Sequence, residues 1–169
     1  MEYAIIFLPL IGSILGYLGK SITKFFSEIF TTLLTCISAI LSLIVFFKGI
    51  KSDNYDNYKI IEWISSGDFI ANWSINVDPL SSVMLVVVTF VSALVHIYSI
   101  GYMSHDPHKP RFMSYLSLFT FSMLVLVVSD NFLQLFFGWE GVGLCSYLLI
   151  GFWYKKENAN NAAIKAFIV

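Results

Sequence analysis

The chain has 169 residues, of which 57% are hydrophobic and 12% charged, and its formal net charge at pH 7 is −1. Its mean hydropathy of +0.77 lies outside the usual range of soluble globular domains, so the composition predicts an integral membrane protein. The basic residues stand at the ends of apolar segments instead of forming a patch, which argues against a nucleic-acid partner.

Two apolar segments at the start of the chain are predicted to be membrane helices. The first, Tyr3–Gly19, is at the short end of the length that crosses a bilayer, and Gly12 and Gly16 give it a narrow face for a neighbouring helix. We interpret it as a retained helix, because it lacks the basic start and the cleavage site of a signal peptide. The second is Glu28–Phe47, whose hydroxyl groups can bond to carbonyls of their own helix.

A long polar connection, residues 48–78, follows the second span. It contains two runs of alternating apolar and polar residues, Tyr58–Ile64 and Phe69–Val77, separated by a Ser-Ser-Gly-Asp turn. This pattern predicts a β-hairpin. We expect the hairpin to lie on a membrane face, with Trp63 and Trp73 at headgroup level or against a neighbouring subunit. An interfacial loop with no special role is the alternative.

The third predicted span begins at Pro79, where Asp78 can cap the helix, and runs to about Met103. It contains His96, and a lone histidine on an apolar helix is more often a packing residue than a functional one. The next connection, Ser104–Arg111, holds two histidines and an aspartate. Its two prolines favour an extended loop and no further ligand is evident, so we assign no metal site.

The fourth span, Phe112–Val128, is followed after a short turn by the most informative segment, Asn131–Trp153. As a helix this segment is about 34 Å long and crosses a bilayer. Glu140 is its only carboxylate and lies near the middle. On a helix, Glu140 shares its face with Gly143 and Tyr147.

A carboxylate at the centre of a membrane costs about 3 kcal/mol, which favours the protonated form, whereas a nearby cation favours the charged form. Glu140 is therefore a candidate for loading and releasing a proton. The alternative is a buried hydrogen-bonding residue that only holds helices together.

Gly138, Gly141 and Cys145 form a second narrow stripe on which another helix can pack. Cys145 and Cys36 are interpreted as packing residues, since they have neither disulfide nor metal spacing.

The chain closes with Ala162–Val169, which looks like the beginning of a sixth helix and reaches only about 12 Å. We therefore expect a fragment of a longer protein or the product of an interrupted reading frame.

The predicted fold is an all-α integral membrane protein with five spans, the start of a sixth, and an outward-facing β-hairpin between the second and third. With alternating connections, one side holds Lys20, Lys24, Lys109, Arg111, Lys155 and Lys156. That side is predicted to be cytoplasmic, which places the N-terminus outward.

Several motifs carry a resemblance to a known family. Asp130–Leu133 and the run GWEGVGLCSYLLIGFW at Gly138–Trp153 are the most specific, supported by NVDPLSSVML, HIYSIGYM and NAAIKAF. Together they resemble the antiporter-like L subunit (chain 5) of respiratory complex I, a proton-translocating subunit of NADH-quinone oxidoreductase. The resemblance places the chain in the bacterial cell membrane or the mitochondrial inner membrane, with the other membrane subunits of the complex as partners.

The resemblance also implies what the chain does not hold. NADH, FMN, the iron–sulfur clusters and quinone belong to partner subunits, so no cofactor is expected here and the chain alone is not expected to be catalytic. The family's glutamate of the fifth helix falls on Glu140, expected to be the proton carrier, with Tyr147, His96 and Lys165 as support for the proton path. Its lysine partner, in a later broken helix, and the further lysine and histidine residues fall beyond this sequence.

Four regions follow from these features. They are 1–57 with the first two helices, 58–78 with the hairpin, 79–129 with the next two helices, and 130–169 as the start of the antiporter-like domain. Two alternatives stay open: the A subunit of a multisubunit sodium/proton antiporter, and a truncated membrane scaffold that moves no ions.

Overall fold

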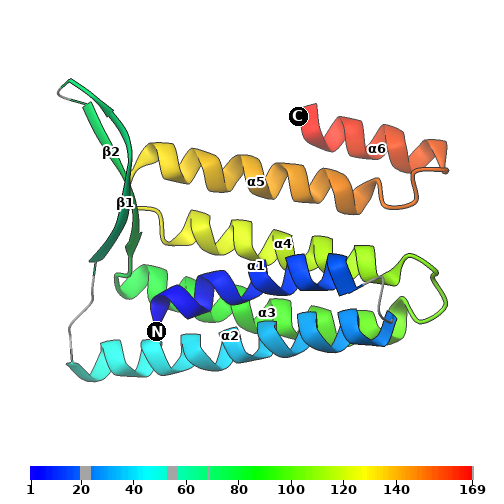
Figure 1. Ribbon diagram of the computed structural model, residues 1–169, viewed down its shortest axis with the longest axis horizontal. Helices are drawn as coiled ribbons and strands as arrows, with labels where there is room; N and C mark the ends of the chain where they lie inside the picture. The colour runs from blue at the N-terminus through cyan, green and yellow to red at the C-terminus, as the bar shows by residue number, and fades with distance from the viewer. Residues whose placement is uncertain (20–23, 53–56, 68, 169) are drawn as a thin grey trace.

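The helices of the protein lie side by side, with a two-stranded hairpin at one end (Figure 1). The computed structural model describes residues 1–19, 24–52, 57–67 and 69–168. The helices are α1 Glu2–Leu18, α2 Lys24–Ser52, α3 Pro79–Tyr102, α4 Lys109–Val127, α5 Phe132–Ile150 and α6 Glu157–Ile168. The strands are β1 Asn57–Ser66 and β2 Phe69–Asn76. Lys20, Asp68 and Val169, used in the predictions above, lie outside the described residues.

Four of the described helices, α2 to α5, are long and apolar enough to cross a membrane, and α1 is a shorter apolar helix. The prediction of a multi-pass membrane protein is thereby supported. Four predicted boundaries are wrong. The second helix begins at Lys24 and not at Glu28, and the fourth begins at Lys109 and not at Phe112. The second helix continues past Phe47 to Ser52, and the last begins at Glu157 and not at Ala162, since its polar first turns lie on exposed faces that do not need apolar residues.

Glycines allow the close helix packing that their spacing predicted. A Cβ on Gly16 of α1 would lie 2.7 Å from Thr31 Cγ2 of α2, and a Cβ on Gly138 of α5 would lie 2.8 Å from the backbone of Leu126 in α4. Both narrow faces are therefore confirmed as helix contacts. Cys145 is buried on the same side of α5 as Gly138, with its Sγ 3.8 Å from Ser122 Oγ.

Hydroxyl groups fill much of the interface between α2, α3 and α4, while many large apolar side chains are exposed on the outside. Thr35 Oγ1 donates to the Thr31 carbonyl of its own helix, as the sequence predicted. Ser42 Oγ, by contrast, lies 2.7 Å from Thr89 Oγ1 of α3, so some of these hydroxyls join different helices. A polar interior with an apolar exterior is the arrangement expected of helices surrounded by lipid.

The predicted hairpin is confirmed as an antiparallel pair, with Asn57 opposite Asn76 and Gly67 at φ 58° in the turn. Ile75 and Val77 are buried in an apolar cluster at this end of the bundle. The other members of the cluster are Ile5, Ile6, Val45, Leu85, Leu124, Val125 and Val128. The hairpin is therefore built into the bundle instead of lying loosely on its surface.

The polar face of β2 meets the start of α5. Gln134, fully buried, accepts a hydrogen bond from the Ser74 N–H (3.1 Å) and donates one to the Ser74 carbonyl (2.7 Å). The predicted tryptophans also turn towards this helix, because the rings of Trp63 and Trp73 lie 6.0 and 5.0 Å from that of Phe137. This contact within the chain was not anticipated from the sequence.

Candidate functional site

Glu140 lies near the middle of α5, eight residues after the first residue, or about 12 Å along the axis. Asn131 caps the helix by accepting a hydrogen bond from the Gln134 N–H at 2.9 Å. The α4-facing side of α5 carries Gly138 and Cys145, both buried, whereas Glu140 is exposed together with Leu144. Glu140 therefore lies on a face of α5 that no described segment covers.

None of the ion pairs among the described residues includes Glu140. A carboxylate at this depth, among apolar neighbours, needs either a proton or a cation when it is in lipid or in a packed interior. Among the described residues, no cation pairs with the Glu140 carboxylate. The interpretation of Glu140 as a proton carrier and its interpretation as a group that holds helices together both stay predictions.

Tyr147, two turns after Glu140, is placed between helices. Its ring lies 5.5 Å from that of Phe167 in α6. It lines a hollow of about 200 Å³ bounded by α4, α5 and α6, together with Arg111 and Tyr115 of α4. The structure therefore associates Tyr147 with this hollow at the end of the bundle.

His96 is completely buried on α3. Its Nδ1 lies 2.8 Å from the Ser92 carbonyl, which can only accept, so Nδ1 carries the proton. Nε2 then accepts from the Ser117 hydroxyl of α4 at 3.0 Å. Both nitrogens are satisfied by the neutral ring, as a packing histidine requires, and a role in a proton path stays a prediction.

Lys165 lies in the last turn of α6 and is exposed. No ion pair among the described residues links it to Glu140. The structure therefore does not bring the four predicted site residues into one cluster: Glu140 and Tyr147 share α5, His96 lies inside the bundle, and Lys165 lies on the outer helix.

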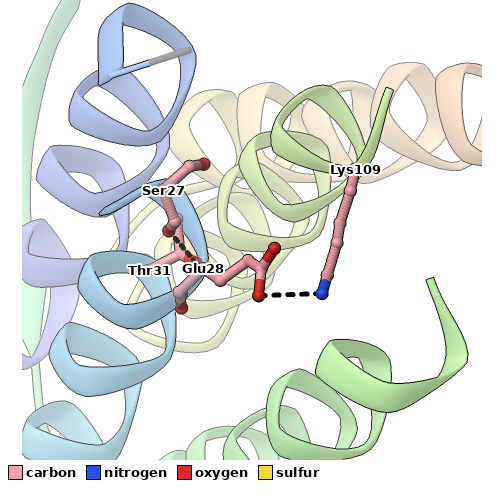
Figure 2. Close-up of polar contacts among 4 residues, drawn as sticks. All are labelled: Ser27, Glu28, Thr31 and Lys109. Carbon is pink, nitrogen blue, oxygen red and sulfur yellow. Dashed lines mark hydrogen bonds and ion pairs between the residues drawn. The ribbon is translucent and has the colours of Figure 1, made fainter. Parts of the chain in front are cut away.

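A charged pair that the sequence analysis missed lies at the other end of the bundle from the hairpin. Lys109 Nζ of α4 and Glu28 Oε2 of α2 are 2.8 Å apart, with only 8% and 10% of their side chains exposed. Figure 2 shows the Glu28 side chain extending from α2 towards Lys109. Beside it, Thr31 donates to the Ser27 carbonyl at 2.8 Å, while the Ser27 hydroxyl is buried without a partner. Sequence spacing held no signal for this pair, since each residue stands at the edge of a different apolar segment.

The loops at this end are tied together by Arg111. Its Nη2 donates to the Phe152 carbonyl after α5 (3.0 Å), and its guanidinium lies over the rings of Phe152 and Tyr154 at 4.7 and 5.5 Å. Asp106 accepts from the Trp153 indole at 3.0 Å. These contacts join the α3–α4 connection to the α5–α6 connection.

Asp106 belongs to the loop predicted to be extended. That prediction is wrong, because residues 103–105 and 107–108 form turns and α4 already begins at Lys109. Partial burial acts to raise the pKa of Asp106, but hydrogen bonds from the His108 N–H and the Trp153 indole, with the charges of His108 and Arg111, outweigh it and lower the pKa. Asp106 therefore acts as a charged anchor for the loop. Among the described residues, no three histidine, cysteine, aspartate or glutamate side chains form a group that could hold a metal ion, and this includes the two histidines of the loop and Asp106.

Comparison with known proteins adds two family matches. Residues 63–113 match the family described as NADH-ubiquinone oxidoreductase (complex I), chain 5 N-terminus. Residues 129–169 match the family described as NADH:quinone oxidoreductase/Mrp antiporter, TM, a segment that includes Glu140, Tyr147 and Lys165.

Curated relatives match nearly the whole chain. NADH-quinone oxidoreductase subunit L of Rickettsia conorii is 56% identical over 166 residues, which are 98% of this chain and 25% of the relative. NADH-ubiquinone oxidoreductase chain 5 of Arabidopsis thaliana is 55% identical over 170 residues, with coverage of 100% and 25%. The chain thus spans about a quarter of the length of these relatives.

A solved structure shares the fold. The structure described as the membrane-bound sulfane sulfur reductase, an archaeal respiratory membrane complex, contains a chain that aligns with a TM-score of 0.80. The alignment covers 99% of this chain and 34% of that one, at 18% identity. At this identity the likeness concerns the arrangement of helices and hairpin alone.

Proposed function

Since the chain belongs to the family of antiporter-like L (chain 5) subunits of respiratory NADH-quinone oxidoreductase, we propose that it contributes to proton translocation, with Glu140 as an intramembrane proton carrier. The observation that carries the proposal is the position of Glu140, halfway along an apolar helix and on a face left uncovered by the described residues. A carboxylate so placed changes its proton affinity strongly when a charged or wet surrounding approaches it.

The energy for this transport comes, in the proposal, from electron transfer between NADH and quinone in partner subunits. NADH, FMN, iron–sulfur clusters and quinone are assigned to those partners, and this chain contributes membrane helices and protonatable side chains. Tyr147 is proposed to support the path as a hydroxyl two turns along the same face of α5 as Glu140. Lys165 is proposed to support it as a cation on α6, and His96 as a buried hydrogen-bonded ring. The curated relatives are named as oxidoreductase subunits, so we do not propose the sodium/proton antiporter alternative.

The topology in the proposal has five spans, with α1 as the first. The N-terminus and the hairpin lie at the same end of the bundle (Figure 1), and the basic residues Lys109, Arg111, Lys155 and Lys156 lie at the other. By the positive-inside rule, the N-terminus and the hairpin then face outward.

The test is the substitution Glu140→Gln in the assembled complex, reconstituted into vesicles. It keeps the shape of the side chain and removes its ability to carry a proton at neutral pH. We expect fewer protons translocated per NADH oxidised. The matched control is Glu157→Gln on the exposed first turn of α6, which should leave that ratio unchanged.

Two further measurements complete the test. A spectrum of the vesicles should show that the variant complex is assembled. Any loss of proton translocation is then due to the substitution and not to failed assembly. An unchanged proton-to-NADH ratio in the Glu140→Gln complex would support the scaffold alternative and refute the carrier role. Infrared difference spectra of the working complex should contain a carboxyl band that disappears in the variant.

A further inference from the structure

Two adjoining hollows meet at Arg111, at the end of the bundle where the α3–α4 and α5–α6 connections lie. The larger, about 200 Å³, lies between α4, α5 and α6. The smaller, about 150 Å³, lies against the α5–α6 connection. Arg111, Phe152 and Tyr154 line both.

Arg111 and three tyrosines give these hollows several hydrogen-bond donors. Arg111 uses Nη2 for the Phe152 carbonyl, and its Nε, which has no hydrogen-bond partner, is itself buried and does not face the hollows. The hydroxyl groups of Tyr115, Tyr147 and Tyr154 line the larger hollow and have no hydrogen-bond partner among the described residues. A guanidinium group cannot accept a hydrogen bond, so a ligand that binds Arg111 must supply acceptor oxygens.

The charged residues around the hollows also favour an anionic ligand. His108, Lys155 and Lys156 line the smaller hollow together with Arg111. Lys156 Nζ lies 5.2 Å from the ring of Trp153. The nearby carboxylate of Asp106 is already engaged by the Trp153 indole and the His108 N–H. The site therefore offers a net positive charge to a ligand, in a pocket with aromatic walls.

The position of the site specifies the kind of ligand. It lies where two apolar helices, α4 and α5, meet polar connections, which is the level of lipid headgroups for helices that span a membrane. Trp153 and Tyr154 are of the aromatic types that gather at that level. Basic pockets between membrane helices bind the headgroups of anionic lipids, and guanidinium groups bind phosphate through two parallel hydrogen bonds.

We propose that the paired hollows around Arg111 bind the phosphate group of an anionic glycerophospholipid. Arg111 and the tyrosine hydroxyls donate to the phosphate oxygens, and Lys155 and Lys156 supply the surrounding positive charge. The acyl chains lie outside, along the apolar surfaces of the helices. Such a lipid stabilises the α5–α6 connection and does not depend on the role of Glu140.

The experiment uses the assembled complex, delipidated in neutral detergent and titrated with phosphatidylglycerol, with phosphatidylcholine, and with inorganic phosphate. Lipid retained after size exclusion is counted by quantitative lipid analysis. We expect phosphatidylglycerol to be retained with at least tenfold preference over phosphatidylcholine, a preference of about the size that a few basic residues supply. Millimolar inorganic phosphate should not displace it, because free phosphate lacks the acyl chains.

Two variants test the site itself. Lys155→Gln/Lys156→Gln should weaken phosphatidylglycerol retention about 10- to 30-fold. The control Lys51→Gln/Lys59→Gln removes the same charge at the hairpin end of the bundle and should have no such effect. Tyr115→Phe removes one free donor from the larger hollow without removing charge, and should weaken retention about threefold, since one hydrogen bond contributes about that much.

Three results would overturn the proposal. Equal weakening by the two double variants would show general attraction to the bilayer. Displacement of the lipid by phosphate would identify free phosphate as the ligand. Unchanged retention in both Lys155→Gln/Lys156→Gln and Tyr115→Phe would show that the hollows hold no lipid. Proton translocation is not measured here, so failure of the Glu140 proposal and failure of this one give separate results.

Discussion

Glu28 Oε2 and Lys109 Nζ form a 2.8 Å ion pair that joins the beginning of α2 to the beginning of α4. Lys109 lies in the first turn of α4, where the positive end of the helix dipole disfavours a cation. Removal of two charges from water is costly, and the attraction between them offsets most of that cost only while both are present. The pair therefore adds little to the net stability, but it favours the arrangement of α2 and α4 in which both charges are paired.

We predict that Glu28→Gln alone destabilises the bundle by about 3–5 kcal/mol, because Lys109 is left buried without a counter-charge. The double variant Glu28→Gln/Lys109→Met should recover most of that loss, since no unpaired charge remains. Thermal unfolding of the detergent-solubilised complex, followed by loss of this subunit, measures both.

The exposed pair of Lys59 and Glu62 provides the control. Its N–O distance is 3.5 Å and about half of each side chain is exposed. Glu62→Gln should change stability by less than about 1 kcal/mol, as is usual for surface pairs. If Glu28→Gln is equally mild, water reaches the Glu28–Lys109 pair and the burial argument is wrong.

Gln134 fastens the hairpin through both polar groups of the Ser74 backbone. Replacement by leucine keeps the volume but leaves a buried N–H and a buried carbonyl unpaired, at a cost of about 2 kcal/mol or more. We expect Gln134→Leu to speed tryptic cleavage after Lys59 in β1. Ser65→Ala, at the exposed far end of the same strand, should leave the cleavage rate unchanged.

Gly138 sets the distance between α4 and α5. Any Cβ there would lie 2.8 Å from the backbone N and Cα of Leu126, and backbone atoms cannot rotate away as a side chain can. Gly138→Ala should therefore cost about 1–3 kcal/mol. Gly101→Ala is the matched control, because a Cβ on Gly101 meets no atom within 4 Å. Equal stability of the two variants in thermal unfolding would show that α4 and α5 lie farther apart than described.

The parts of the fold that depend on local pattern were predictable. Alternating side chains identified β1 and β2 to within two residues, and long apolar runs identified α2 to α5. The start of α6 was missed because Glu157–Asn161 is polar, and polarity alone does not distinguish a loop from an exposed helix turn. Whether a polar segment is a loop or an exposed helix turn depends on what it packs against, and the local sequence pattern does not show this.

The candidate site was predictable only in part, for a related reason. The depth of Glu140 and the narrow stripe of Gly138 follow from helical geometry, so sequence alone identified them. Contacts such as Gln134 with Ser74, or Glu28 with Lys109, join residues far apart in the chain. They depend on which helices are neighbours and how each is rotated, and no local spacing encodes either.

Asp78 makes the start of α3 sensitive to acid. Its Oδ1 accepts hydrogen bonds from the Ser81 hydroxyl and the Ser81 N–H, and these, in that order, lower the pKa of Asp78 despite slight burial. A lowered pKa means that the folded helix favours the ionised group. The stabilisation is complete above the ordinary aspartate value of about 3.9 and is lost as pH falls through the lowered value. Asp78→Ala should cost about 1 kcal/mol at neutral pH, whereas Asp78→Asn retains a good cap but no longer responds to pH.

Hydrogen exchange of the amides of Ser81 and Ser82, corrected for the intrinsic effect of pH, measures this cap directly. Protection should fall below about pH 4 in the native chain, stay flat in Asp78→Asn, and be low at every pH in Asp78→Ala. Ser82 N–H bonds to the Asp78 carbonyl at 2.9 Å, so its protection reports the first turn itself. If protection in the native chain is the same at pH 3 and pH 6, the carboxylate does not hold the turn, and Pro79 at the first helical position is sufficient to begin α3.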